Sequence, residues 1–403
     1  MKLALAATLL AACSFPTPSE QYACRTSDDC SSDRVCTQGF CVVGNQSIDA
    51  PIVDADLTID CTTFPARHFD ACMIPKPTGN LALTTMGIYT YDTTSGALLD
   101  PGGGSSLPPS AVFATGRVLS VSSLTVGPGV TLRAIGTHPL IVASWGTIEV
   151  SGTIDATSQG TPPTIGAGAN PTTCATHAAT QGQNAGGGAG GGGGGGFRGV
   201  GGRGGVGDIG NGGPGGQAIA IPLLAGGCAG AAGGTGSSAA GLGGDGGGAV
   251  QLTARVSISI AGTGIVVAGG AGGKPAGPSG DGGGGGGGGS GGMIGLEAPM
   301  VTAMTSAVIA ANGGAGGEGG GNMGTAGTGQ NGQPSATAAT CPNTGSGGNG
   351  GSGNGGLVVN GGQGGNDTSG GGGAGGAAGF IAIKATTPTT AGAIISPAAT
   401  TIP

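Results

Sequence analysis

Cysteine is the residue type with the clearest chemistry in this chain, which has ten cysteines among 403 residues. Four of them lie in the polar segment CRTSDDCSSDRVCTQGFC, as Cys24, Cys30, Cys36 and Cys41. A zinc site would need cysteines two residues apart or a nearby histidine, and this segment has neither. Disulfides are therefore the better interpretation, and four cysteines allow three pairings. We favour Cys24–Cys36 together with Cys30–Cys41.

The remaining cysteines are spread along the chain. Cys61 and Cys72 are close in sequence and are expected to pair with each other. Cys174 and Cys228 both lie in a long glycine-rich stretch, which a disulfide between them would close. Cys341 is then left over, and it could instead replace either of those two.

A further cysteine ends the N-terminal segment MKLALAATLLAAC. Lys2 is a minimal basic region, and residues 3–10 form an apolar stretch too short to span a bilayer. The following Leu-Ala-Ala-Cys13 resembles the bacterial lipobox, in which cleavage leaves the cysteine as a lipidated first residue. An ordinary signal peptide cut near Ala12 is the alternative. Either implies export, and export agrees with disulfides.

Other chemistry is sparse. The three histidines, His68, His138 and His177, have no metal-binding spacing, so no metal site is expected. Glycine motifs of nucleotide-binding sites occur through composition alone, without a strand and helix around them, so no cofactor is expected. Twelve basic residues are too few to predict nucleic-acid binding.

Carboxylates could support one catalytic alternative. Enzymes that cleave polysaccharides on a β-helix use clusters of charged residues on one face of its coils. Glu149 and Glu297 could lie on an outward face, but no partner cluster is visible beside them. A solvent-facing role is the simpler expectation, so we predict a protein that is not an enzyme and has no catalytic residues.

An internal repeat indicates the elements that carry these residues. Segment 249–273 aligns without a gap to segment 293–317, matching Leu252 with Leu296 and Ile265 with Ile309. Apolar residues alternate with polar ones in VQLTARVSISI, so one strand face is buried. About five such units predict a mainly β fold, a parallel β-helix or solenoid-like stack; two packed sheets are the alternative.

Glycine-rich insertions separate the units, at about 157–247, 270–292 and 314–378, and account for most of the 101 glycines. They leave each unit at the same point, so stacking should place them along one edge. Alone, such tracts are flexible coil. Side by side, they can form extended threefold helices, the polyglycine II arrangement. The glycines at 190, 193, 196, 199, 202 and 205 keep a three-residue phase.

These features give a linear plan for the chain, whose acidic residues are concentrated before residue 101. The plan is a signal peptide (1–12), a lipidated tether (13–23), a disulfide module (24–43), an acidic linker (44–60), a hairpin or cap region (61–115) and the β-solenoid with its insertions (116–403).

The lipobox-like segment, the CRTSDDCSSDRVC module, FDACMIPKPTGNL, IYTYDT and the interrupted β units together resemble the glycine-rich surface lipoproteins of social gliding Gram-negative bacteria. The tracts are also similar to the polyglycine II domains of phage tail-fibre adhesins and of some antifreeze proteins. The resemblance implies a lipid-anchored outer-membrane protein at the cell surface with a structural or adhesive role. Its expected partners are the membrane and a polysaccharide or another surface component; an ice- or surface-binding protein is a further alternative.

Overall fold

The computed structural model describes residues 26–30, 34–37, 40–43, 61, 64–220, 223–277 and 282–402. Two compact units divide the chain, 1–60 and 61–403. The predicted signal peptide, Cys13 with its tether, Cys24 and the acidic linker lie outside the described residues.

The first unit is a small hairpin. It contains the 3-10 helix η2 (Ser27–Asp29) and the antiparallel strands β1 (Arg34–Thr37) and β2 (Phe40–Val43). Cys30 bonds to Cys41 across 11 residues, which is one of the two pairs that we favoured. Cys36 is also disulfide-bonded. The module is thus held by cross-links, as expected where a short polar segment cannot bury a core.

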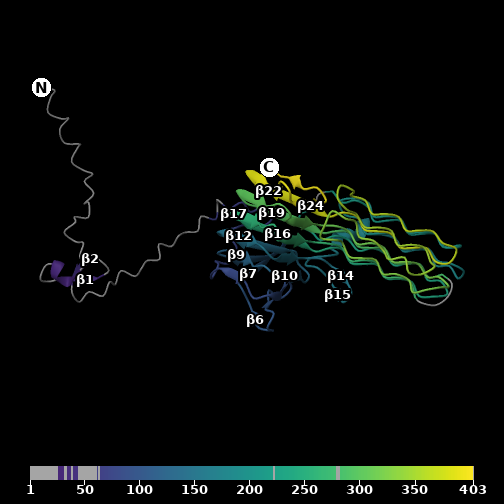
Figure 1. The fold of residues 1–403 in the computed structure, drawn as a ribbon, viewed down its shortest axis with the longest axis horizontal. Coiled ribbons are helices and arrows are strands. Elements are labelled where there is room, and N and C mark those ends of the chain that lie inside the picture. The colour runs from purple at the N-terminus through teal and green to yellow at the C-terminus, as the bar shows by residue number, and fades with distance from the viewer. Residues whose placement is uncertain are drawn as a thin grey trace, which may run out of the picture. The chain divides into compact units, whose positions relative to one another are not determined.

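The second unit contains a parallel β-helix with three sheets, each named here after one strand (Figure 1). The β16 sheet contains β7 (Ser110–Phe113), β8 (Gly116–Val121), β11 (Leu140–Ser144), β16 (Ala249–Ala254), β19 (Met293–Glu297), β22 (Phe380–Lys384) and β25 (Thr400–Thr401). The β17 sheet contains β3 (Leu81–Leu83), β9 (Leu124–Val126), β12 (Thr147–Val150), β17 (Ser257–Ile260), β20 (Met300–Ala303) and β23 (Thr387–Thr389).

The β18 sheet completes each coil. It contains β4 (Gly87–Asp92), β5 (Leu98–Leu99), β6 (Ser105–Ser106), β10 (Val130–Ile135), β13 (Thr153–Asp155), β18 (Ile265–Val267), β21 (Val308–Ala310) and β24 (Ile394–Ser396). A separate small hairpin pairs β14 (Gln159–Gly160) with β15 (Pro163–Thr164), and the 3-10 helix η4 spans Thr172–His177. The predicted solenoid is therefore present, and the alternative of two packed sheets is wrong.

Inward-facing side chains of successive coils stack on one another because the coils pair in register. Leu132, Ile154, Val266 and Ile309 form one such row, and each is fully buried in a core that runs the length of the stack. Burying a side chain of this size contributes about 1.5–3 kcal/mol. The core therefore needs only one large apolar residue at each inward position, which explains how a chain with 3% aromatic residues folds.

The gapless repeat alignment is correct for the first strand of each unit and wrong for the third. Leu252 pairs with Leu296 as predicted, but Ile265 pairs with Val308, one residue before Ile309. From Thr253 to Ser257 the chain advances four residues, whereas from their partners, Glu297 to Met300, it advances only three. This shift places Ile309 beside Val266 and inside the core, so the identity of the two isoleucines is coincidental.

The predicted cap region 61–115 provides the first coil of the stack itself. Strands β3 and β4 pair in parallel with β9 and β10. The hairpin expected in this region is present, because β4 turns into the antiparallel β5. Residues 64–74 cross the outer face of the β16 sheet, where Phe64, Phe69 and Ile74 pack against it. That outer face is therefore buried.

All three long insertions leave after a strand of the β18 sheet and return to a strand of the β16 sheet. They emerge at the same corner of successive coils, as the sequence predicted. Figure 1 shows them running away from the β-helix as long, nearly parallel traces. We call this part, residues 178–379 without the strands, the bundle.

Backbone hydrogen bonds in the bundle change direction with a period of three residues. Gly285, Gly288 and Gly291 all donate to tract 370–379, at 2.8–3.0 Å. The residues between them donate to two other tracts. Three residues per turn is the period of the polyproline II helix, which has no internal hydrogen bonds and must bond sideways. The bundle is a polyglycine II arrangement, and its described residues are ordered by these contacts.

Tract 282–292 is enclosed on every side. Its hydrogen-bonded neighbours are the tracts 189–197, 226–236, 239–248, 268–277, 311–320 and 370–379. Tracts 189–197 and 370–379 also bond to six neighbours each, and every residue in tracts 189–197, 282–292, 311–320 and 370–379 is buried. The packing is hexagonal, with these tracts inside and the others around them.

Glycine is required in the enclosed tracts because a neighbouring carbonyl lies where a side chain would begin. A Cβ atom on Gly287 would lie 2.0 Å from the carbonyl oxygen of Gly193. By contrast, a Cβ atom on Gly186, in a loop at the far end of the bundle, would meet nothing within 4 Å. The two glycines therefore differ in the space around them, although both lie in the bundle.

Replacing Gly287 by alanine should lower the free energy of unfolding by about 3 kcal/mol or more, because the new methyl group must push two backbones apart. Chemical denaturation followed by circular dichroism, with hydrogen exchange of the amides in tract 282–292, measures the effect. Gly186→Ala is the matched control and should stay within about 0.5 kcal/mol of the parent. Equal midpoints for both variants would contradict the close packing.

Candidate functional site

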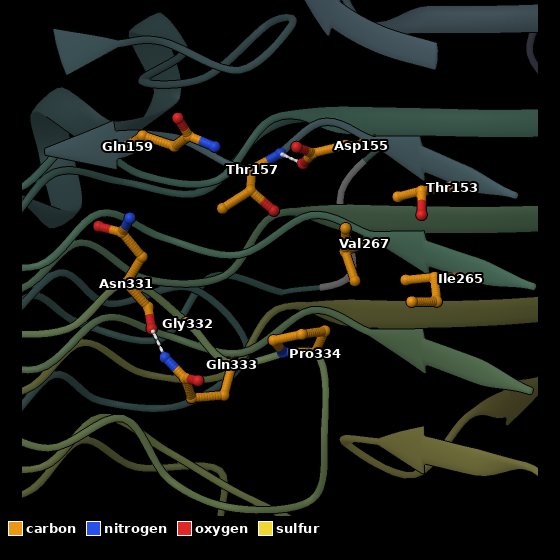
Figure 2. A pocket seen from close by; sticks show the side chains of 10 residues that line it. All are labelled: Thr153, Asp155, Thr157, Gln159, Ile265, Val267, Asn331, Gly332, Gln333 and Pro334. Carbon is orange, nitrogen blue, oxygen red and sulfur yellow. Dashed lines mark hydrogen bonds between the residues drawn. The ribbon is translucent and has the colours of Figure 1, made fainter. Parts of the chain in front are cut away.

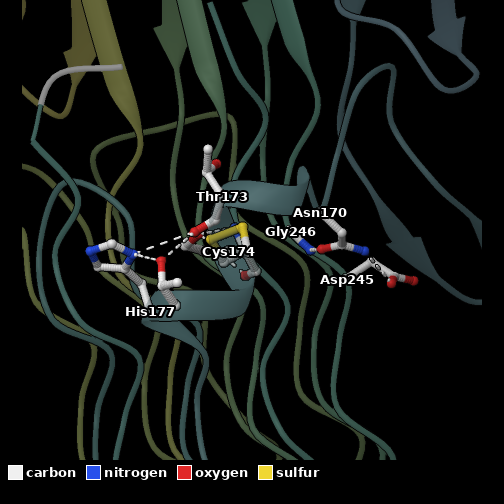
Figure 3. The surroundings of a disulfide bond; sticks show 9 residues. Asn170, Thr173, Cys174, His177, Asp245 and Gly246 are labelled. Carbon is white, nitrogen blue, oxygen red and sulfur yellow. Dashed lines mark hydrogen bonds between the residues drawn. A yellow bond between two sulfur atoms is a disulfide. The ribbon is translucent and has the colours of Figure 1, made fainter. Parts of the chain in front are cut away.

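A disulfide links the bundle to the short helix that precedes it. Cys174, in η4, bonds to Cys228 in tract 226–236 over a separation of 54 residues (Figure 3). This is the pair expected from the sequence, and Cys341 is the free cysteine among the described residues. Closing a loop of this length restricts the unfolded chain strongly, worth about 4 kcal/mol by the chain-entropy argument. Cys61 bonds to Cys72, also as expected.

A polar clamp lies beside that disulfide. The Asn170 side chain donates to the Asp245 carboxylate at 2.8 Å and accepts from the Gly246 N–H at 2.9 Å (Figure 3). Asn170 has a φ of 53°, a left-handed conformation that asparagine tolerates better than most residues. The clamp and the disulfide fix the start of the first insertion to two neighbouring tracts.

A groove of about 300 Å³ lies between the β-helix and the bundle (Figure 2). Its lining comes from the ends of β13 and β18, from the segment that follows β13, and from the bundle tract at 331–334. A second hollow of about 300 Å³ adjoins it and shares Asn331 and Gln333. We call the two hollows together the junction groove.

The floor of the junction groove is apolar and its rims are polar. Ile265 and Val267 belong to a small apolar cluster on the outer face of the β18 sheet. Thr153 and Gln159 line one rim, and Asn331 and Gln333 line the other, with their amides toward the same space in Figure 2. An apolar surface with a few convergent polar groups is the usual build of a ligand site.

The one charged side chain that lines the groove, Asp155, is already paired. Arg133 forms an ion pair with Asp155, whose other carboxylate oxygen accepts from the Thr157 N–H at 2.7 Å. The ammonium of Lys274 donates to the Gly160 carbonyl and to the Thr161 hydroxyl. The groups that remain for a ligand are therefore neutral amides and hydroxyls.

A second polar cluster is buried under segment 64–74. The Gln251 amide donates to the Glu297 carboxyl at 3.0 Å and to the Thr253 hydroxyl at 2.9 Å, while its oxygen contacts His68 Nδ1. Glu297 is 3% exposed. It faces outward from the β16 sheet, but the 64–74 segment covers that face.

Burial controls the protonation of this cluster. Desolvation raises the pKa of the Glu297 carboxyl to about 7, and the nearby Arg67 and Lys384 reverse only part of that rise. Desolvation also lowers the pKa of His68, against the opposing effect of its Gln251 hydrogen bond. A neutral carboxyl can donate a proton to an acceptor, whereas a buried carboxylate would need a closer cation.

The structure separates the two carboxylates considered for catalysis. Glu149 is exposed on the β17 sheet, where its register neighbours are Thr125 and Ser259. Glu297 lies on the β16 sheet and is buried, so the expectation that it faces solvent is wrong. The two cannot act together on one bond, because paired acid and base carboxylates must flank it.

Sequence analysis did not identify the residues of the junction groove. Gln159, Asn331 and Gln333 lie inside the glycine-rich insertions, where no periodic strand pattern marks them. Their only signal is that amide side chains interrupt glycine tracts at positions that face outward. Glu318 was missed for the same reason: it is fully buried, and its carboxylate accepts from the N–H groups of Gly327 and Gly345 at 2.6 and 2.9 Å.

Within the described part of the chain, no group of three or more histidine, cysteine, aspartate or glutamate side chains could hold a metal ion. Within that same part, no helix has the length and hydropathy needed to cross a bilayer. Comparison of the chain with protein-family models, with curated proteins and with solved structures finds no match. The function must therefore be argued from the residues and their geometry.

Because Glu297 stays protonated in the folded state while it ionises in the unfolded chain, stability should fall as the pH rises from about 4.5 to about 7, by about 3 kcal/mol. Glu297→Gln should remove that decline. Denaturant titrations at intervals across this pH range measure it, and comparison of parent with variant cancels the opposite effect of His68 below pH 6.5. Glu149→Gln, at an exposed site, is the control. A decline that persists in Glu297→Gln would contradict the assignment.

Proposed function

We propose that this protein is a non-enzymatic cell-surface lipoprotein with a structural or adhesive role at the bacterial envelope or in the extracellular matrix. The observation that carries the proposal is the hexagonal hydrogen-bonded bundle built on one corner of a β-helix. Such a bundle is stiffened mainly by backbone hydrogen bonds, and its enclosed tracts consist mostly of glycine. It suits display of a surface better than turnover of a substrate.

The disulfides support a place outside the cytoplasm. Three disulfides join described cysteines, at Cys30–Cys41, Cys61–Cys72 and Cys174–Cys228. Such bonds persist in oxidising compartments and are rare in the reducing cytosol. Together with the lipobox-like segment before Cys13, they favour an exported protein held by lipid at the outer membrane.

An enzyme that cleaves polysaccharides is the first alternative, and the separation of Glu149 from Glu297 removes the carboxylate pair that suggested it. Binding to an ordered surface such as ice is the second alternative. Asn360, Gln363 and Asn366 are exposed at intervals of three residues on an outer tract, about 9 Å apart at the polyproline II rise. This regular, uncharged row favours that alternative.

Residues 14–403, purified and applied to bacterial polysaccharides and whole-cell envelopes, should be retained without releasing new reducing or unsaturated ends. Affinity measurement and end-group assays on the same samples test both points, and an ice-recrystallisation assay tests the ordered-surface alternative. Release of oligosaccharides would contradict the non-enzymatic proposal. Absence of retention on every support would contradict adhesion and leave a structural coat role.

In a Gram-negative host fed an alkyne fatty acid, the full chain should become labelled and fractionate with the outer membrane. Cys13→Ala should abolish the label, because the thiol that carries the diacylglycerol is gone. Cys341→Ala, which removes a free thiol elsewhere, should leave the label unchanged. Label that survives in Cys13→Ala, or no label in the parent, would count against lipid anchoring.

A further inference from the structure

The junction groove has several features of a binding site. It combines parts of the chain that are far apart in sequence: the end of β13, the end of β18 and the bundle tract at 331–334. The hollow near the first coil, by contrast, is lined by Leu81, Leu107, Pro108 and Pro109 with small polar groups. The junction groove exists only because the third insertion folds back against the β18 sheet.

Several of its polar groups are still able to bond to a ligand. The Asn331 side-chain oxygen accepts from the N–H groups of Gly160 and Gly272, at 3.3 and 3.0 Å, which leaves its NH₂ group. The Gln333 NH₂ group donates to the Asn331 carbonyl at 2.7 Å, which leaves its oxygen (Figure 2). The Gln159 amide makes no hydrogen bond to another described residue, so it offers both a donor and an acceptor.

These groups select a neutral ligand rich in hydroxyls. A sugar hydroxyl both donates and accepts, and vicinal hydroxyls match an amide that does the same. The C–H face of a sugar ring can cover the partly exposed Ile265 and the small accessible part of Val267. No cationic side chain lines either hollow, and the one carboxylate that does, Asp155, is already paired with Arg133, so the lining offers an anionic ligand no counter-charge.

We propose that the junction groove binds a segment of a neutral polysaccharide, with Gln159, Asn331 and Gln333 as its hydrogen-bonding residues and Ile265 and Val267 as its apolar floor. This inference rests on the adhesive role proposed above and names the site and the class of partner. The adjoining hollow extends the groove past Thr328 and Gln330, so more than one sugar unit fits along it. No aromatic side chain lines it, so each contact is weak and affinity depends on several units together.

Soluble hexasaccharides test the groove directly on residues 14–403. The neutral probes are maltohexaose, cellohexaose, laminarihexaose and chitohexaose, and the acidic probe is hexagalacturonate. Titrations by calorimetry should show binding of at least one neutral probe and of no acidic one. Gln159→Ala should weaken that binding about five- to tenfold, the loss expected for about one or two hydrogen bonds. Gln363→Ala removes an exposed amide on an outer tract and should have no effect.

The binding role of the groove and the adhesive function of the protein would be contradicted by different results. No binding of any neutral probe, or equal binding by Gln159→Ala and the parent, overturns the groove. Weakened hexasaccharide binding with unchanged envelope retention in Gln159→Ala would support the groove and show that adhesion uses another surface. If neutral probes bind to the groove but envelopes do not retain the protein, the groove is supported and the adhesive role is overturned. Matched denaturation midpoints for the two variants confirm that both are folded.

Discussion

This molecule depends on hydrogen bonds between the backbones of neighbouring glycine tracts. These bonds can form only where no Cβ atom lies between the two backbones. In the enclosed tracts a side chain would begin about 2 Å from a neighbouring carbonyl oxygen, so only glycine allows the tracts to approach. Tracts 189–197, 282–292 and 370–379 then each donate in three directions, and six neighbours surround each of them. Glycine loses more conformational freedom on folding than other residues, and this lattice of bonds offsets that cost. The tracts are therefore ordered only as a group.

The β-helix determines where each glycine-rich tract begins and ends. Successive coils hold the strands of the β18 sheet and the β16 sheet one above another, so the insertions leave and return at stacked points. The end of one tract is also joined to a sheet: Phe197 packs edge-on against Phe380, with ring centroids 5.0 Å apart. The disulfide between Cys174 and Cys228 and the Asn170–Asp245 clamp fix the base further. The bundle is thus an extension of the β-helix, and the junction groove lies where the two meet.

Much of this fold could be predicted from the sequence, because alternation of apolar residues and repetition of a unit are local signals. Ile148 and Ile258 alternate with polar residues, and the structure pairs them in register. The register of Ile265 could not be predicted, because the next unit reaches its second strand one residue sooner than the gapless alignment assumes. The burial of Glu297 could not be predicted either, since it results from Phe64 and Phe69, distant in sequence, crossing over its sheet. The groove residues depend on contacts between insertions, which carry no local pattern.

The three-residue period of the hydrogen bonds in the bundle restricts which insertions and deletions its tracts can accept. Inserting or deleting one glycine in tract 282–292 would rotate every later residue by a third of a turn, so each N–H would point to the wrong neighbour. The loss or gain of three residues would restore the directions and alter only the length. Length variants of the bundle that keep these hydrogen bonds should therefore differ by whole turns of the helix.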